Sequence, residues 1–87
     1  MDIEFDPAKS DRNIRERGLS FEHAVEFDFA TAKIAEDIRK GYGEQRFMAL
    51  GKLYGRVHML VFSETPRGIR IISFRKANRR EVKLYET

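Results

Sequence analysis

The sequence predicts an α+β fold in which two N-terminal helices and one C-terminal helix pack on one face of an antiparallel β-sheet. Three observations lead to this prediction. Two helix-start signals lie before residue 21, the hydrophobic pattern becomes strand-like near residue 31, and a third helix-start signal occurs at Asn78. The expected order of elements is therefore β-α-α-β-β-β-β-α.

The chain begins with a short predicted edge strand and a well-marked helix. Ile3 and Phe5 alternate with a polar residue, which is typical of a strand with one buried face. Asp6 and Pro7 then form a helix cap followed by a proline at the first helical position. Gly18 is suited to end this helix in the left-handed conformation.

The two N-terminal helices differ in their apolar faces. The first has only Ala8 and Ile14, so most of its surface should face solvent or a partner. In the second, shorter helix, Phe21, Ala24 and Val25 have the i, i+3, i+4 spacing of a buried face.

Four strands and a final helix are expected after residue 31. The strands are predicted at residues 32–36, 45–53, 57–62 and 69–74, and the helix runs from its cap at Asn78 to about residue 86. The last three strands are joined by turns too short for a parallel crossover, so they should form an antiparallel meander. Residues 57–62 are nearly all apolar, which predicts a central strand buried on both faces.

Length and composition favour one small domain over residues 1–87. The chain has 41% hydrophobic residues, including seven Phe, and no Cys. This is enough for a single core, and it excludes disulfides, thiolate zinc sites and cysteine nucleophiles. No apolar stretch reaches the roughly 18 residues of a membrane span, and the acidic start is unlike a signal peptide. We therefore expect a soluble, cytoplasmic protein with no membrane contact.

The net charge of +3 hides an asymmetry between the two halves. Residues 1–44 carry seven basic and eleven acidic residues, a net charge of −4, whereas residues 45–87 carry ten basic and three acidic residues, a net charge of +7. Clustered Lys and Arg attract polyanions, so the second half is the expected nucleic-acid-binding part. Scattered charges that only solubilise a small domain are the alternative.

Most catalytic chemistry is hard to assemble from this sequence. His23 lies in a predicted helix and His58 in an apolar strand, and each is expected to be a packed or surface residue because a metal site needs three or four convergent ligands. The glycines do not form a phosphate-binding loop followed by a helix. We therefore expect no metal site and no cofactor, and arginine, glutamate and tyrosine remain as candidates.

The first group of candidates lies at the end of the last strand and in the last helix. Strict alternation would put Ile71, Ser73 and Arg75 on one face of the strand and Phe74 on the other. In the helix that follows, Glu81 could act in chemistry, but a capping box with Asn78 is the favoured interpretation. Tyr85, four residues further on, could equally be an aromatic residue at the edge of the core.

The second group is Tyr42, Glu44 and Arg46, which would share a face if the strand begins that early. A surface ion pair is the default interpretation of Glu44 and Arg46. The alternative is metal-free RNA cleavage, in which a carboxylate takes the proton of the 2′-hydroxyl, arginines stabilise the phosphorane and a tyrosine or basic group assists the leaving oxygen. Glu44, Arg46, Arg75 and Tyr85 supply these residue types, although spacing alone does not show that they converge.

An ordered set of motifs over almost the whole chain resembles the BrnT family of bacterial type II toxins. The motifs are Phe5-Asp6-Pro7-Ala8-Lys9, Asn13, residues 18–24 (GLSFEHA), 36–39 (EDIR), 42–47 (YGEQRF), Leu50-Gly51, 69–77 (IRIISFRKA), Arg79-Arg80-Glu81 and Tyr85. The resemblance implies a small RelE-like ribonuclease that cuts RNA without a metal and inhibits translation. It also implies neutralisation by a BrnA-like ribbon-helix-helix antitoxin, and the complex would bind its own promoter DNA through that antitoxin.

The resemblance nominates Arg75, Arg46, Glu44 and Tyr85 as catalytic residues. We expect Arg75 and Arg46 to stabilise the phosphorane, Glu44 to act as general base, and Tyr85 to stack on a base or assist proton transfer. The residues expected to bind the RNA backbone are Lys76, Arg79, Arg80 and Lys9.

Two positions depart from the pattern of the resembled family. Arg17 stands where the family commonly has His, and Phe74 stands where a small residue is usual. If that histidine were the general base, activity would be affected. A non-catalytic module that binds nucleic acid or antitoxin through the same basic surface is the rival interpretation, and a structural interaction protein that neither cleaves nor binds RNA is the third.

Overall fold

A computed structural model describes residues 1–39, 41 and 43–87. The elements are β1 (Asp2–Glu4), α1 (Pro7–Arg17), the 3₁₀ helix η1 (Phe21–Glu26), β2 (Lys33–Asp37), β3 (Arg46–Leu53), β4 (Arg56–Glu64), β5 (Gly68–Lys76) and α2 (Arg79–Glu86). The strands form one sheet in the order β1-β5-β4-β3-β2, with β4 at its centre. β1 runs parallel to β5, and the other pairs are antiparallel. The predicted α+β class, the meander and the central position of the strand are confirmed. The strand is not fully buried on both faces as predicted, because Met59 and Val61 are half-buried.

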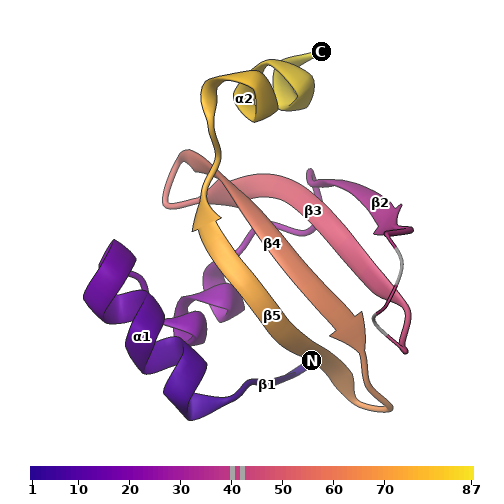
Figure 1. Ribbon diagram of the computed structural model, residues 1–87. Coiled ribbons are helices and arrows are strands. Elements are labelled where there is room, and N and C mark those ends of the chain that lie inside the picture. The colour runs from indigo at the N-terminus through magenta and orange to yellow at the C-terminus, as the bar shows by residue number, and fades with distance from the viewer. Residues whose placement is uncertain (40, 42) are drawn as a thin grey trace.

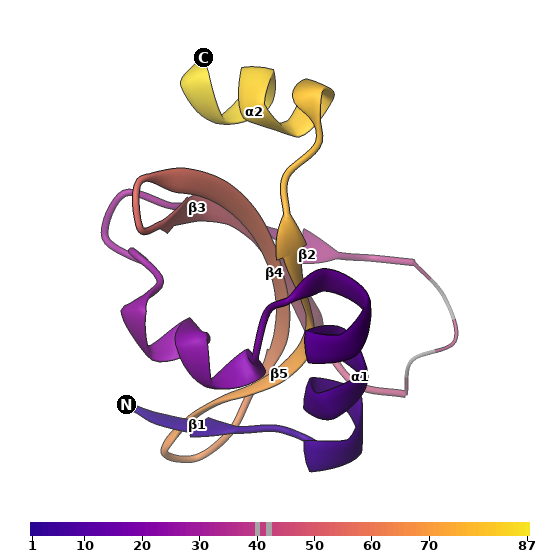
Figure 2. The same cartoon turned by 90° about the vertical axis from the view of Figure 1, so that its left-hand side faces the viewer.

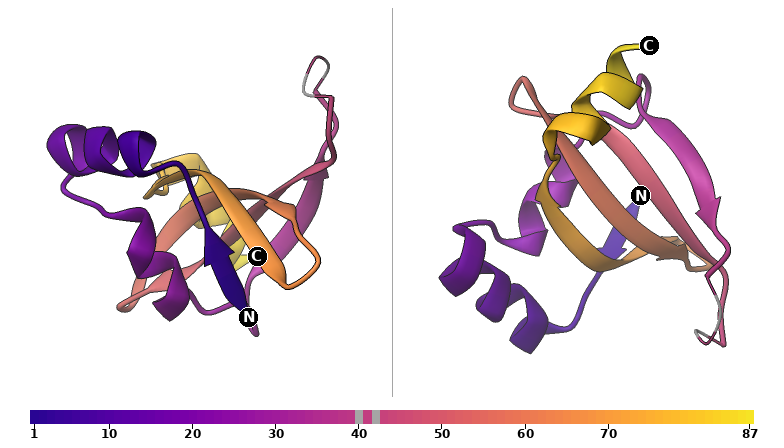
Figure 3. Two further views of the ribbon diagram at one scale, coloured as in Figure 1. Left: turned by 90° about the horizontal axis from the view of Figure 1, so that it is seen from below. Right: turned by 45° about the horizontal axis from the view of Figure 1, so that its top comes forward.

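The sequence predicted that all three helices cover one face of the sheet. This prediction was wrong, because the helices are distributed around the sheet. η1 packs on one face, α1 lies beside β5, and α2 stands at the end of the sheet (Figures 1 and 2). The right-hand view of Figure 3 shows α2 and α1 at opposite ends of the sheet. On the opposite face, α2 contacts β3 and β4 at one end, where Leu84 shares a hollow with Met48 and Met59. Among the described residues no helix covers the rest of this face, which we call the open face.

The core lies between η1 and the sheet. It is built from apolar side chains that the alternation of β3, β4 and β5 directs to the same face, together with the buried residues of η1. The buried cluster comprises Phe21, Ala24, Phe27, Ala49, Leu53, Leu60, Phe62, Ile69, Ile71 and Phe74. This packing leaves the other side chains of the strands to form the open face.

The second helix is a 3₁₀ helix, and this corrects one part of the predicted core. Phe21 and Ala24 are buried as expected, but Val25 is 67% exposed. A 3₁₀ helix has three residues per turn, so i and i+3 share a face while i+4 is rotated away. The next residue on the buried side is Phe27, which is 5% exposed.

Polar contacts position α1, which explains its narrow apolar stripe. Its predicted ends are confirmed, because the Asp6 side chain caps it and Gly18 adopts φ 68° after its last turn. Ser10 is buried, and its hydroxyl accepts a hydrogen bond from the Phe21 amide at 3.0 Å. The side-chain amide of Asn13 donates to the carbonyl oxygens of Leu19 and Phe74, both at 2.9 Å. The helix is thereby fixed to the edge of β5 with little apolar burial.

A β-bulge in β5 overturns the predicted strict alternation. Val61 pairs with Ser73, whereas Phe62 pairs with Ile71, so Ile72 is the extra residue. The bulge lets both Ile71 and Phe74 enter the core, where they are 2% and 0% exposed. The prediction that Ile71 and Arg75 share a face was therefore wrong.

The buried position of Phe74 leads to a stability prediction. Phe74→Ala should lower the free energy of unfolding by about 3–5 kcal/mol, because it removes a fully buried ring and leaves a cavity. The matched control Val25→Ala, at an exposed apolar position, should change it by less than about 0.5 kcal/mol. Urea denaturation followed by circular dichroism measures both values, and equal effects would contradict the described core.

Candidate functional site

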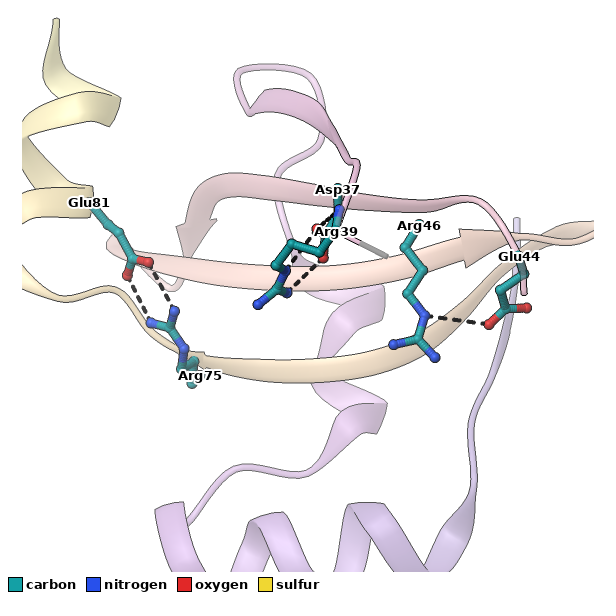
Figure 4. A network of polar contacts seen from close by, with 6 residues as sticks. All are labelled: Asp37, Arg39, Glu44, Arg46, Arg75 and Glu81. Carbon is teal, nitrogen blue, oxygen red and sulfur yellow. Dashed lines mark hydrogen bonds and ion pairs between the residues drawn. The ribbon is translucent and has the colours of Figure 1, made fainter. Parts of the chain in front are cut away.

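The main hollow of the open face lies beside residues 72–75 of β5 and has a volume of about 480 Å³. Cations and a carboxylate surround an apolar floor. The lining residues are Arg39, Arg46, Met48, Met59, Val61, Ile72, Ser73, Arg75 and Glu81. The side chains of Arg39, Arg46 and Arg75 extend over the same side of the sheet (Figure 4). Arg46 and Arg75, two of the four nominated catalytic residues, thus line the same hollow.

Arg75 is fixed by a bidentate ion pair with Glu81 of α2. The two Nη atoms of Arg75 donate to the two carboxylate oxygens of Glu81 at 2.8 and 2.9 Å. Glu81 Oε1 also accepts from the backbone amide of Asn78, and Asn78 Oδ1 accepts from the amide of Glu81. The predicted capping box is therefore confirmed. The same carboxylate connects the start of α2 to the end of β5.

This ion pair keeps both of its members charged. The hydrogen bonds from Arg75 are the main cause that lowers the pKa of Glu81 below its usual 4.5, against the effect of burial. Reciprocally, Glu81 raises the pKa of Arg75. At neutral pH the hollow therefore contains a guanidinium of fixed orientation next to an ionised carboxylate.

Arg39 and Asp37 form a second pair at the end of β2. Asp37 is 4% exposed, and its two oxygens accept from Arg39 Nε at 2.9 Å and Nη2 at 2.7 Å. The Arg39 side chain is 69% exposed. The carboxylate thus fixes one edge of the Arg39 guanidinium group, while most of the side chain stays exposed.

Glu44 lies at the far end of the open face, away from Arg75 (Figure 4). Its carboxylate pairs with Arg46 Nε at 3.6 Å and accepts hydrogen bonds from Arg70. Hydrogen bonding by Arg70 is the main cause that lowers the pKa of Glu44. Because β3 begins at Arg46, Glu44 precedes the strand and the two residues do not alternate along it; the predicted third member, Tyr42, lies outside the described residues.

Tyr85 does not line the hollow. It is half-buried, and its hydroxyl lies 3.4 Å from Thr31 Oγ1, just before β2. Nearby, Lys33 Nζ donates to the carbonyl oxygen of Leu84 at 2.9 Å. These contacts connect α2 to the edge of the sheet at β2. Tyr85 therefore has the position expected of an aromatic residue at the edge of the core.

The four basic residues that were predicted to bind the RNA backbone lie in three different hollows. Arg79 and Arg80 line a shallow hollow on α2 together with Lys83. Lys76 points to the α1 side of β5, where it shares a hollow with Arg17 and His58. Lys9 lines a further hollow between α1 and β5. None of these four residues belongs to the lining of the main hollow.

The two histidines are a surface and a packed residue, as predicted. His23 is exposed, and its Nδ1 lies 3.2 Å from the hydroxyl of Tyr54. His58 is 4% exposed, and its Nδ1 lies 2.8 Å from the carbonyl oxygen of Arg56, so this nitrogen carries the proton. Desolvation by burial lowers the pKa of His58. Within the described part of the chain no three histidine or acidic side chains cluster in a geometry that could hold a metal ion.

The open face has the chemistry of a site for a flexible polyanion. Three guanidinium groups can donate to phosphate oxygens, and the apolar side chains between them offer contact area for bases. Two ionised carboxylates, Glu81 in the hollow and Glu44 at its far end, can accept protons.

Sequence reasoning missed Arg39, and the available signal was weak. Arg39 lies beyond the end of β2, where alternation no longer assigns a face. Asp37, two residues earlier, was not recognised as the buried carboxylate that directs it. Glu81 was recognised as a cap, but its contact with Arg75 depends on the bulge in β5 and was not visible in the sequence.

The Arg75–Glu81 pair predicts a pH-dependent contribution to stability. Because the pKa of Glu81 is lower in the folded than in the unfolded state, its stabilisation is complete above the unfolded value and is lost as pH falls through the folded value. Glu81→Gln should therefore lower the free energy of unfolding by about 1–2 kcal/mol at pH 7. Urea titrations should show this difference from the wild type shrinking as the pH falls below the ordinary pKa of the carboxyl group, 4.5.

The control for this prediction is Glu86→Gln, which changes the same charge at the exposed end of α2. It should have less than about 0.5 kcal/mol of effect at pH 7. A Glu81→Gln deficit that stays constant from pH 7 to pH 3 would show that the ion pair does not produce the stabilisation.

Comparison with known proteins identifies the family of the chain. No helix in the described residues is long and apolar enough to cross a membrane. Among curated proteins, none matches the chain. The family model described as "Ribonuclease toxin, BrnT, of type II toxin-antitoxin system" matches residues 5–81. This match includes α1, η1, the four strands β2 to β5 and the capping residues of α2, so the chain belongs to the BrnT ribonuclease toxin family of type II toxin-antitoxin systems.

Proposed function

We propose that the chain is a metal-independent endoribonuclease toxin that cuts RNA on the open face. Membership of the BrnT family supports the ribonuclease activity. The observation that carries the assignment of the site is the shared hollow in which Arg39, Arg46 and Arg75 extend over one side of the sheet. A phosphate there would meet several donors whose positions are fixed by ion pairs.

In the proposed reaction, the 2′-oxygen attacks the adjacent phosphorus and the bond from phosphorus to the 5′-oxygen breaks. A carboxylate accepts the proton of the 2′-hydroxyl, and the leaving 5′-oxygen takes up a proton. Arg46 and Arg75 stabilise the charge that develops on the phosphorane oxygens. The products are a 2′,3′-cyclic phosphate and a 5′-hydroxyl, with no change in oxidation state and no need for a metal ion.

Two carboxylates could be the general base. Glu44 is the residue nominated by the sequence, and its contact with Arg46 supports that role. Glu81 is a second candidate, because it lines the hollow next to Arg75. We propose Glu44 as the base and Glu81 as the residue that positions Arg75, and single variants separate the two.

The remaining predicted residues surround this centre. Tyr85 would stack on a base or assist proton transfer if the RNA extends toward α2, and Arg79 and Arg80 would bind the backbone there. Tyr85→Phe separates these two roles of Tyr85, because it keeps the stacking ring and removes the hydroxyl.

The toxin is expected to inhibit translation and to be neutralised by a BrnA-like ribbon-helix-helix antitoxin. The family supports a cognate antitoxin, since it is a family of type II toxins. In the proposed complex, promoter DNA is bound through the antitoxin. A short ribbon-helix-helix gene next to the toxin gene would support this partner, and a solitary gene would speak against it.

The cleavage test uses purified protein and labelled single-stranded RNA in EDTA. Wild type should cleave the RNA, and Arg75→Ala and Arg46→Ala should each lower the rate by about 10²–10³-fold, because each removes a donor to the phosphorane. Glu44→Gln should lower the rate more than Glu81→Gln. Gel electrophoresis of the products, with detection of the cyclic phosphate end, measures all four effects.

The matched control is Arg56→Ala, which removes one exposed cation at the start of β4. It should leave the rate within about twofold of wild type, which corresponds to about 0.4 kcal/mol. Gel retardation with intact RNA would favour the rival non-catalytic nucleic-acid-binding module. Cleavage that EDTA abolishes would contradict metal independence.

A further inference from the structure

A second hollow, of about 180 Å³, lies between α1 and β5. It is separate from the main hollow of the open face and has mostly charged and polar walls. Its lining residues are Lys9, Arg12, Asn13, Glu16, Arg17, Phe21, Ile72 and Ser73. With three cations and one carboxylate, its lining has a net positive charge.

The charged lining comes from one face of α1. Lys9, Arg12, Glu16 and Arg17 follow the i, i+3, i+7, i+8 spacing that places residues on the same side of a helix. Asn13 lies on this face as well, and its hydrogen bond to the carbonyl oxygen of Phe74 holds the face against β5. Although α1 belongs to the acidic half of the sequence, it presents a cationic surface at this place.

The two hollows are neighbours at the edge of β5. Ile72 and Ser73 line both of them, and Ile72 is the bulged residue of the strand. β1 pairs with β5 only along Gly68–Arg70, so the strand pairing ends before this point. A chain bound on the open face can therefore pass over Ile72 and Ser73 toward α1.

Cations continue beyond the α1 hollow. Arg17 also lines a third hollow, of about 310 Å³, which contains Lys76 and His58. Lys76 follows Arg75 in the sequence but lies on the opposite side of β5. The basic residues of the α1 face thus lie between the cations on one side of β5 and those on the other.

We propose that the α1 face is an extension of the RNA-binding surface, which holds the phosphates of nucleotides that flank the cleaved bond. The RNA crosses β5 at the bulge and places its backbone against Lys9 and Arg12, while Arg17 leads on toward Lys76. The inference rests on the proposed ribonuclease function of the open face. It also predicts the path of the bound RNA across β5, and it predicts that affinity increases with the length of the RNA.

The test measures the binding of full-length protein to 2′-O-methyl RNA, which cannot be cleaved because its 2′-oxygen is blocked. Fluorescence anisotropy compares a trinucleotide with a dodecanucleotide of mixed sequence over a series of salt concentrations. Lys9→Ala/Arg12→Ala should weaken binding of the dodecanucleotide by about tenfold at 0.1 M salt and reduce the slope of log K against log salt by about 1.4, the value for two phosphate contacts on a single strand. Binding of the trinucleotide should change by less than about twofold.

The matched control is Arg15→Ala/Arg67→Ala, which removes the same charge at two exposed positions outside the three hollows. An equal loss in this control would mean that net charge alone matters and would overturn the inference. Wild-type affinity of Lys9→Ala/Arg12→Ala for the dodecanucleotide would also overturn it, while leaving the ribonuclease proposal intact.

Failure of the proposed function gives a different result. If the wild-type protein binds neither the trinucleotide nor the dodecanucleotide, both the ribonuclease proposal and the proposed RNA-binding role of the α1 face are overturned. If the double variant binds RNA normally but loses binding to the antitoxin, the α1 face is a protein interface. Thermal unfolding of both double variants verifies that they remain folded.

Discussion

The arrangement of the open face depends on the β-bulge at Ile72. Without the extra residue, the alternation that buries Ile69 and Ile71 would continue through Ser73 and Arg75 into the core. A buried unpaired guanidinium would cost several kcal/mol. The bulge instead places Phe74 in the core, where it is fully buried, and leaves Arg75 on the open face. One inserted residue therefore serves both the core and the site.

The groups around the bulge are connected by contacts that reinforce its geometry. Asn13 donates to the carbonyl oxygen of Phe74 and so fixes α1 at the same point. On the other side, Glu81 holds Arg75 and begins α2. Helix positions and arginine orientation are thus set by a few polar contacts, in a chain whose apolar core lies on the opposite face. This division leaves much of one side of the sheet open in a chain of 87 residues.

Features that depend on local residue patterns could be predicted from the sequence. These include the cap at Asp6, the left-handed Gly18, the meander of β3 to β5 and the capping box of α2, because each is encoded within a few neighbouring residues. The bulge was not predictable, since Ile71, Ile72 and Phe74 are all apolar and no local signal marks which of them is the extra residue. The 3₁₀ geometry of η1 was also missed, and with it the exposure of Val25. Of the candidate site, Arg46 and Arg75 were predicted to act together, whereas Arg39 and the partners of each arginine depend on long-range contacts.

RNA is expected to bind at the cleaved bond on the open face, where three guanidinium groups line the main hollow. NMR of ¹⁵N-labelled protein tests it most directly, because the arginine Nε–H resonances report on each side chain separately. On titration with a 2′-O-methyl RNA hexanucleotide, the Nε–H resonances of Arg39, Arg46 and Arg75 should shift in a saturable way, while the backbone amides of His23 and Val25 on η1 stay unchanged. Saturable shifts confined to η1, with these three arginines unaffected, would contradict the account.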